Sequence, residues 1–360
     1  MPHFVTADLG HSELKSVRLD TRHVQKMPYG MKALGNAEWK AEVARANKQP
    51  AAGKTKTFLM DGKPVQVGAQ AALDFHYSQL RGSEKYTPDH MKFLMAAQLL
   101  MHWPKGTSEE IHLSIAHPPD AVHYRSMLAK SVGGRYVITV PGLNKKVKFH
   151  VKTVTPWDEA SGAVTHWLAN TAPEKRIKES IIIVDIGGKI SSMTKADISK
   201  INNKWQINVQ YTAESSVTYW SGILTIYDRI KDELKNTYSD LVQPLLPISY
   251  DICKEIVEQK GYFRIHNDMV DVTEAYTQAI ISFESEFKTA YSKLGSGLRA
   301  NRIVCSGGGT GALYHLLPDW LNHPNITPAH NLKFIEEANV LGGNEIFRDE
   351  MTYQGKYNGK

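Results

Sequence analysis

The chain has few cysteines and no long apolar run. The first argues against a disulfide-stabilised protein, and the second argues against a protein with a membrane-spanning helix. Its 360 residues include two cysteines, Cys253 and Cys305, which are too few for a disulfide framework. The first residues lack the charged region and apolar run of a secretory leader, so we expect a cytoplasmic protein. The longest nearly continuous apolar stretch, Phe93–Met101, falls short of the ~20 residues that cross a bilayer. We therefore expect no membrane-spanning helix.

Basic residues are in slight excess but do not form a block. The chain has 43 Lys and Arg against 37 Asp and Glu, a formal net charge of +6 and a pI of about 9.0. The cations are scattered along the sequence, without the dense runs of many nucleic-acid-binding tails. A solvated, mildly basic surface explains this balance, so direct contact with nucleic acid is not expected. With 42% hydrophobic residues the chain can bury a core, and its length favours two domains.

Two turns that pair an aspartate with a glycine divide the sequence into similar halves. Each turn follows an apolar strand and precedes a second strand, which is typical of a β-hairpin. The turns begin at Asp8 and Asp185. The strands beside them are predicted at residues 4–6, 14–19, 181–184 and 191–198. This repeat predicts two lobes of similar build, each offering a glycine turn to one shared cleft.

The remaining segments predict an α/β protein. A further hairpin is expected around Asp61 and Gly62, whereas residues 31–56 show no clear period. Other strands are predicted at residues 111–116, 136–140, 147–154, 205–212 and 302–305. Helices are predicted after Thr87 and at residues 119–132, 221–236, 248–258, 271–294 and 335–348. Asp271 and Glu274 have the spacing of a capping box at the start of one of these helices.

A third glycine loop, residues 306–311, follows the last predicted strand. Glycine turns let backbone N–H groups approach an anion closely because no Cβ intervenes. A carboxylate beside such a turn can hold Mg²⁺ or its coordinated waters, and Mg²⁺ bridges phosphates. One Asp-x-Gly turn alone is a common structural turn. Three glycine loops, two of them with an aspartate, together predict a site for nucleotide phosphates.

Other motifs carry less weight. Residues 48–55 resemble a P-loop, but Lys48 replaces its first glycine, and residues 39–46 before it read as a helix rather than a strand. Residues 307–312 match a dinucleotide fingerprint, which keeps a dehydrogenase as an alternative, although too little chain follows for a full doubly wound domain. Neither the His nor the Cys spacing suits zinc, and no serine-hydrolase elbow occurs.

Five segments resemble, in order, the signature segments of the actin-like ATPases. In that family they are called phosphate 1, connect 1, phosphate 2, adenosine and connect 2. Here they are Asp8–Lys15, Pro156–Ala163, Asp185–Lys189, Ser306–Thr310 and Glu337–Gly343, which together span nearly the whole chain. The first loop, Asp-x-Gly-x-x-x-x-Lys, and the compact length are most similar to ParM and its plasmid and phage relatives.

The resemblance implies an α/β fold of two actin-like lobes, built from duplicated ribonuclease H-like domains with small variable subdomains. Lobe I would comprise residues 1–163 and 331–360, with a variable subdomain near 30–86. Lobe II would comprise residues 164–330, with a variable subdomain near 230–285.

The resemblance also implies roles for the loop residues. Asp8 and Asp185 would organise Mg²⁺, through its waters. Contacts to ATP, or to GTP, are expected from Gly10, Ser12, Lys15, Gly187, Gly188, Lys189, Ser306, Gly307, Gly308, Gly309 and Thr310. Glu159 falls where this family places the group that orients the attacking water, and Asp158 is the nearest alternative.

The second glycine turn departs from the family pattern. Many relatives have a hydroxyl and a second acid after the glycines, whereas this chain has Lys189, Ile190, Ser191 and Ser192. Lys189 either adds a phosphate contact or points outward as an ordinary turn lysine. The sequence therefore leaves open whether the chain hydrolyses nucleotide slowly or not at all.

By this resemblance the chain is a Mg²⁺-dependent ATPase. It would form head-to-tail filaments for the segregation of plasmid or phage DNA and would disassemble them after hydrolysis. The expected partners are further copies of the chain and an adaptor protein bound to centromere-like DNA, with no membrane. A nucleotide-gated scaffold without catalysis and a small-molecule kinase of the same superfamily are the alternatives.

Overall fold

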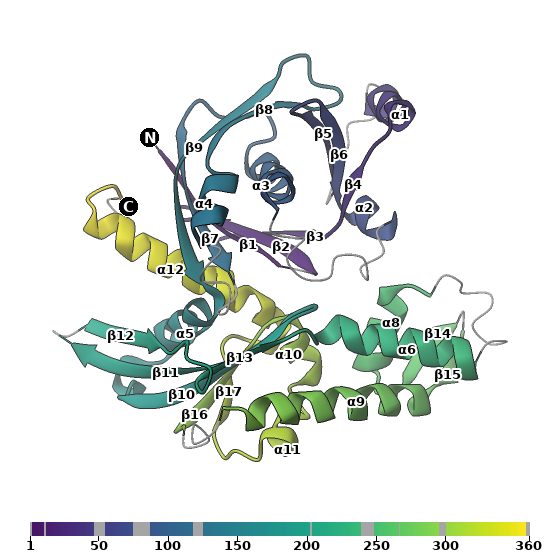
Figure 1. Ribbon diagram of the computed structural model, residues 1–360, viewed down its shortest axis with the longest axis vertical. Coiled ribbons are helices and arrows are strands. Elements are labelled where there is room, and N and C mark those ends of the chain that lie inside the picture. Colours follow the sequence, from purple (N-terminus) through teal and green to yellow (C-terminus); the bar gives the residue numbers. More distant parts are fainter. Residues whose placement is uncertain are drawn as a thin grey trace. The chain divides into compact units, whose positions relative to one another are not determined.

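The computed structural model divides into two compact units (Figure 1). Unit 1 comprises Met1–Ala169 and Asn339–Lys360, and unit 2 comprises Asn170–Ala338. The structure describes residues 2–10, 12–46, 55–74, 87–117, 125–201, 204–238, 248–265, 267–294 and 300–357. Residues 48–54 of the P-loop-like segment and residues 119–124 of a predicted helix lie outside these ranges.

Unit 1 is built on a mixed sheet. Among the described residues its strands follow the order β3-β2-β1-β7-β9-β8-β5-β6-β4. They are β1 His3–Leu9, β2 Glu13–Arg18, β3 Val24–Pro28, β4 Met31–Ala33, β5 Thr55–Met60, β6 Lys63–Gly68, β7 Glu110–His117, β8 Gly134–Thr139 and β9 Val147–Asp158. Strands β1, β7 and β9 are parallel. Strands β1 and β7 are largely buried because helices and neighbouring strands cover them, whereas β9 has outward-facing residues along its length.

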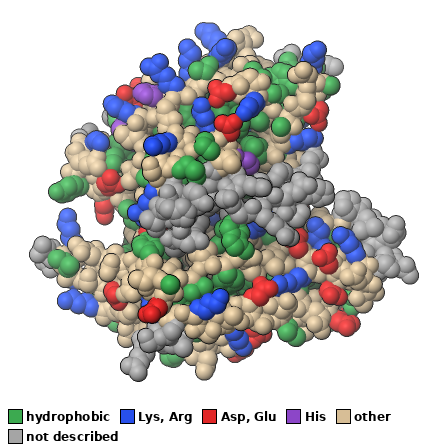
Figure 2. Space-filling model, in the orientation of Figure 1, with side chains coloured by type: hydrophobic (Ala, Val, Ile, Leu, Met, Phe, Trp, Pro, Cys, Tyr) green, Lys and Arg blue, Asp and Glu red, His purple; other side chains and the backbone are tan. Residues whose placement is uncertain are grey.

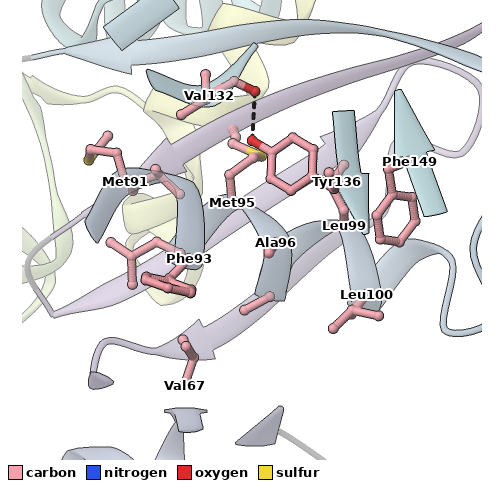
Figure 3. Packing of buried hydrophobic residues seen from close by; sticks show 14 of the residues in the cluster. Val67, Met91, Phe93, Met95, Ala96, Leu99, Leu100, Val132, Tyr136 and Phe149 are labelled. Carbon is pink, nitrogen blue, oxygen red and sulfur yellow. Dashed lines mark hydrogen bonds between the residues drawn. The ribbon is translucent and has the colours of Figure 1, made fainter. Parts of the chain in front are cut away.

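Helix α3 supplies much of the core of unit 1. Its apolar residues pack against side chains from β8 and β9, as Figure 3 shows for Met95, Leu99, Tyr136 and Phe149. The Tyr136 hydroxyl, fully inside this core, donates a hydrogen bond of 2.6 Å to the carbonyl of Val132. The helices of the unit are α1 Asn36–Ala46, α2 Ala69–Asp74, α3 Pro88–His102, α4 Arg125–Val132, α5 Glu159–Asn170 and α12 Ala338–Tyr353.

Unit 2 has a smaller sheet, in which the order is β12-β11-β10-β16-β17 and β13 also pairs with β11. The strands are β10 Glu179–Ile186, β11 Ser191–Ile201, β12 Lys204–Val209, β13 Ser216–Tyr219, β16 Arg302–Ser306 and β17 Ile326–Pro328. A separate hairpin joins β14 Tyr262–Ile265 to β15 Asp268–Asp271. The helices are α6 Ile223–Thr237, α8 Tyr250–Glu258, α9 Thr273–Ser292, α10 Gly308–Leu313 and α11 Leu317–Leu321, with 3₁₀ turns at Pro173–Lys175 and Leu332–Glu337.

The two sheets share one strand order. In unit 1, β1 has its hairpin partner β2 on one side and the parallel strand β7 on the other. In unit 2, β10 has its hairpin partner β11 on one side and the parallel strand β16 on the other. The five-strand orders β3-β2-β1-β7-β9 and β12-β11-β10-β16-β17 therefore correspond strand by strand. The prediction of two halves of similar build is confirmed at this level.

Several local predictions need correction. The capping box at Asp271 is wrong, because helix α9 begins at Thr273 and Asp271 Oδ1 accepts the Thr273 N–H at 2.9 Å. Residues 31–56, which show no clear period, contain β4 and α1, and α1 confirms the helix read at residues 39–46. The helix predicted at 335–348 is a 3₁₀ turn that runs into α12.

In the part of the chain that the structure describes, no helix is long and apolar enough to span a bilayer.

Candidate functional site

The first glycine turn joins β1 to β2 and places Asp8 opposite Lys15. The antiparallel register pairs these residues directly, and Lys15 Nζ lies 3.2 Å from Asp8 Oδ2. Both side chains are buried. Asp8 Oδ1 is also buried, and it accepts no hydrogen bond from any described residue. An unsatisfied carboxylate oxygen in a buried position is costly unless a ligand or an ordered water completes it.

Gly10 makes the turn tight enough for this pairing. A Cβ at Gly10 would lie 2.6 Å from the carbonyl oxygen of Glu13, so a larger residue would push the two strands apart. Ser12 is partly buried, and its carbonyl accepts the N–H of Tyr29, the residue after β3, at 2.9 Å. Gly10, Ser12 and Lys15 thus surround one turn, beside Asp8. His11 of the same turn lies outside the described residues.

Asp158 and Glu159 lie where β9 meets α5. The parallel register of Ala7 with Ile115, and of Ile115 with Pro156, brings the ends of β1, β7 and β9 to one edge of the sheet. Asp158 therefore shares an edge with the first glycine turn. Its two carboxylate oxygens accept the N–H and the hydroxyl of Ser161, at 2.7 and 2.5 Å, so it acts as the N-terminal cap of α5. Glu159, the first helical residue, is partly exposed.

Helices α5 and α12 of unit 1 cross at a point where glycines form the contact. A Cβ at Gly342 would lie 1.7 Å from the carbonyl oxygen of Gly162, and a Cβ at Gly162 would lie 2.6 Å from the carbonyl oxygen of Asn339. The Trp157 ring fills the adjacent space, because a Cβ at Gly343 would come within 2.2 Å of it. The backbones of the connect 1 and connect 2 segments are thus in direct contact, which only residues without a Cβ allow.

The second glycine turn and the third loop meet in unit 2. Asp185 at the end of β10 is opposite Ser306 at the end of the parallel strand β16. Gly307 follows with φ +88°, and a Cβ there would lie 2.3 Å from Asp185 Oδ1. Any side chain at 307 would therefore displace the carboxylate. The structure brings Asp185 and the Ser306–Thr310 loop together, as expected for two parts of one site.

Helix α6 begins on the second glycine turn. The carbonyls of Gly187 and Gly188 accept the N–H groups of Ile223 and Leu224 at 3.1 and 2.8 Å. The turn itself closes through the Gly187 N–H, which donates to the Ile190 carbonyl at 3.0 Å. Hydrogen bonds therefore fix the backbone orientation of both glycines. Lys189 at the tip of the turn is partly exposed.

The third loop opens the short helix α10. The Thr310 hydroxyl donates to the Ser306 carbonyl, and the Thr310 N–H donates to the Gly307 carbonyl at 3.1 Å. Gly309 packs on Ile186, where a Cβ would lie 2.6 Å from Cγ2 of that side chain, whereas Gly308 has ordinary contact distances. The Ser306 hydroxyl is completely buried and has no hydrogen-bond partner within the described ranges. A polar group of a ligand could satisfy it.

Sequence reasoning missed a hydroxyl from β13 near the second turn. The register pairs Asp185 with Ser192, and Ser192 with Thr218, so these side chains share one face of the sheet with Ser306. Thr218 Oγ1 is buried without a hydrogen-bond partner among the described residues. Ser192 or Thr218 could supply the hydroxyl that the turn lacks, but the row contains no second acid. No motif signals Thr218, because strand pairing alone brings it beside the turn.

The two cysteines lie in the interior of unit 2. Cys305 precedes Ser306 on β16, and burial together with the charge of the nearby Asp185 raises the pKa of its thiol. Cys253 is on α8, and burial raises the pKa of its thiol to about 12. Both side chains are inaccessible to solvent. They are structural residues rather than nucleophiles.

The donor set suits a hydrated Mg²⁺ and phosphates. Carboxylate and hydroxyl oxygens are the ligands that Mg²⁺ prefers, directly or through water. Asp8 Oδ1 and the Ser306 hydroxyl are buried, and neither has a hydrogen-bond partner within the described ranges. No group of three or more His, Cys, Asp or Glu side chains with metal-binding geometry occurs within the described ranges. In either unit, a turn that holds the metal largely through waters and phosphates, with a single carboxylate, is compatible with these observations.

No family model matches the chain, and no curated protein matches it in sequence. Solved structures match nearly all of it. A ParM structure from a 15-stranded filament of Clostridium botulinum has a TM-score of 0.74 and 17% identity, over 97% of this chain and 99% of that one. The archaeal actin homologue Ta0583, which is also known in complex with ADP, has a TM-score of 0.70 and 13% identity, over 97% and 100%. The actin-like protein Alp7A has a TM-score of 0.69 and 14% identity, over 99% and 98%. This chain therefore has the actin-like fold.

Proposed function

We propose that this chain is an ATP-dependent polymerising protein, of the kind that ParM represents. One observation carries the proposal. In a chain of actin-like fold, each unit ends a corresponding strand, β1 or β10, with a buried aspartate beside a tight glycine turn. Turns of this construction suit Mg²⁺ and nucleotide phosphates. We propose that each turn takes part in binding ATP.

The loop residues would bind and orient the nucleotide. Lys15, paired with Asp8, would neutralise phosphate charge. The peptide groups of Gly187 and Gly188 are held by α6, and those of Gly307–Gly309 lie against Asp185 and Ile186, so both loops have their backbones fixed before a ligand arrives. When bound, Mg²⁺ would supply positive charge that stabilises the negative charge developing on the phosphates. Asp8 and Asp185 would hold its waters.

Glu159 would orient the water that attacks the γ-phosphate. Its carboxylate can accept a hydrogen bond from water. Its neighbour Asp158 uses both oxygens on Ser161, which leaves it less able to perform this role. The two residues lie at the sheet edge that also carries the Asp8 turn. Hydrolysis would then act as a timer for disassembly.

In the cell the filament would move plasmid or phage DNA. Head-to-tail contacts between identical subunits give open filaments when their rotation does not close a ring. An adaptor protein bound to centromere-like DNA would attach the cargo, and the protein would work in the cytoplasm.

Assembly in the presence of different nucleotides tests the proposal. Purified protein is sedimented at several concentrations with Mg-ATP, Mg-GTP, Mg-ADP or no nucleotide, and light scattering follows the same samples. We expect pelleting with Mg-ATP, or with Mg-GTP, and much less with ADP or without nucleotide. Equal sedimentation in all four conditions would contradict the proposal.

A nucleotide-gated scaffold without hydrolysis is the second candidate. It is favoured by the second turn, where Ser192 occupies the cross-strand position opposite Asp185 and no second acid is present. Phosphate release separates the two candidates. Assembly with ATP but without release of phosphate would support the scaffold, and release that accompanies disassembly would support the ATPase.

A further inference from the structure

One surface of unit 1, which the proposed function does not use, gathers positive charge. From Ala121 to Trp157 the sequence contains seven Lys and Arg and no Asp or Glu. The whole chain has a net charge of +6, so the remainder, with 36 cations and 37 acids, has a net charge of −1. The entire positive balance of the chain therefore comes from this segment.

Strands β8 and β9 and the turn between them carry five of these seven cations, whereas Arg125 and Lys130 lie on α4. Along β9, the buried residues Val147, Phe149 and Val151 alternate with outward residues. The register pairs Arg135 with His150, and the turn between the strands carries two more lysines. We name this surface the basic face, made of Arg135, Lys145, Lys146, Lys148, His150 and Lys152. Figure 2 shows blue side chains at the end of unit 1 where Figure 1 places β8 and β9.

The cations of this face are mostly unpaired. Lys152 contacts Glu110 at 2.6 Å, but no described residue forms an ion pair with Arg135, Lys145, Lys146 or Lys148. Five other cations of unit 1 do have acidic partners. These pairs are Arg18–Asp20, Lys32–Glu38, Arg45–Glu42, Lys63–Asp89 and Lys92–Asp61. Unpaired like charges repel each other, and a polyanion would remove that repulsion.

The chemistry of the face favours a nucleic-acid duplex over a protein. Protein interfaces usually centre on buried apolar or aromatic anchors. Here the large apolar side chains exposed nearby are Val137 and Leu143, while Tyr136 and Phe149 point into the core. Without an exposed aromatic among its described residues the face also lacks the stacking platform that single strands need. Contact with the phosphates of a duplex requires only the cations.

We propose that the basic face binds the phosphate backbone of double-stranded nucleic acid without reading its sequence. Alternate residues of an antiparallel strand repeat at roughly 6.8 Å, which equals about two base-pair steps along a duplex strand. The sequence argued against direct contact because the cations are scattered along it. The alternation of β9 and its pairing with β8 bring them together. This inference goes beyond the proposed function and does not depend on it.

The test is a salt titration of duplex binding by the full chain without nucleotide. Fluorescence anisotropy follows a short labelled duplex, and the logarithm of affinity is plotted against the logarithm of salt. With four unpaired cations we expect a slope of about −3 to −4. The triple variant Lys145→Gln, Lys146→Gln, Lys148→Gln should have a slope near about −1 and an affinity at least about tenfold lower at low salt.

A matched control removes three lysines from unit 2. Lys178, Lys204 and Lys235 are exposed, and no ion pair is found for them among the described residues. The triple variant Lys178→Gln, Lys204→Gln, Lys235→Gln should show the same slope of log affinity against log salt as the wild type. An unchanged slope in the basic-face variant, or an equal loss in the control, would overturn the proposal. Binding of polyglutamate as tightly as the duplex would assign the face to an acidic protein and would also overturn it.

Discussion

Two adjacent acids, Asp158 and Glu159, have different surroundings. The cap hydrogen bonds to Ser161 occupy both oxygens of Asp158. Glu159 begins the helix and is partly exposed. A residue that holds a helix end contributes mainly to stability, whereas one that faces water can contribute to chemistry.

Alanine substitutions separate these roles. Glu159→Ala should keep ATP binding and assembly but lower the rate of phosphate release by about 10²–10⁴-fold, because a water-orienting group is lost. Asp158→Ala should instead lower the free energy of unfolding by about 0.5–2 kcal/mol through loss of the cap. Phosphate release and denaturant unfolding are measured for both variants. Wild-type release by Glu159→Ala would refute the assignment and move it to Asp158.

At the scale of residues, the sequence predicts contacts within one hairpin better than contacts between strands that are far apart in the sequence. Asp8, Gly10 and Lys15 belong to one hairpin, so their proximity follows from short-range turn geometry. The contact between Asp185 and Gly307 depends on a parallel pairing over more than a hundred residues. The resemblance of the five segments suggested that contact. Thr218 has no such support, because it belongs to no signature segment.

At the scale of elements, helices α5 and α12 cross with their backbones in direct contact. The Gly162 carbonyl occupies the place where residue 342 would carry a Cβ. Glycine within a helix costs about 1 kcal/mol relative to alanine, so these helices are less stable in isolation than they could be. The close crossing offsets that cost through packing.

Gly342→Ala should therefore destabilise the protein despite its higher helix propensity. A Cβ at 1.7 Å from a backbone oxygen cannot be accommodated without moving a helix, and overpacking of this kind costs typically about 1–3 kcal/mol or more. Gly308→Ala is the control, since its Cβ would lie 3.6 Å from the nearest atom. Thermal and denaturant unfolding of both variants are compared. Equal or greater stability of Gly342→Ala would show that α5 and α12 can move apart without a loss of stability.

The elements that the sequence did not predict are short or lie at edges. Strand β13 has four residues, partly buried, and shows no alternation that could mark it. Strand β17 ends in Pro328, which cannot donate to a ladder and argues against a strand when it is seen in sequence. The hairpin β14–β15 forms a two-stranded sheet of its own. Long periodic helices such as α9 were predicted, because their pattern extends over several turns.

At the scale of the whole molecule, the shared strand order gives each unit one aspartate in an equivalent position. If both aspartates serve one Mg-ATP, their contributions to its binding cannot be independent. Residues that act on one ligand show interaction energies of about 0.5–3 kcal/mol, whereas unconnected sites are additive within about 0.5 kcal/mol.

A double-mutant cycle tests this coupling. Mg-ATP affinity is measured for Asp8→Asn, Asp185→Asn and the double variant, each of which keeps the shape of the side chain. We expect the double variant to lose less binding free energy than the two single variants lose together. Repeating the cycle with ATP and a chelator should abolish most of the coupling. Strict additivity with Mg²⁺ would mean that the two turns do not act on a common ligand.

The inaccessible cysteines have a practical consequence for studying this chain. Cys253 and Cys305 are the only thiols in the sequence, and both are sealed in the interior of unit 2. Maleimide dyes attack thiolates, which buried thiols of raised pKa do not supply. A cysteine introduced at an exposed site of unit 1 would therefore be the one position labelled in the native protein. Donor- and acceptor-labelled pools of such a variant could report subunit exchange directly, with both native residues left in place.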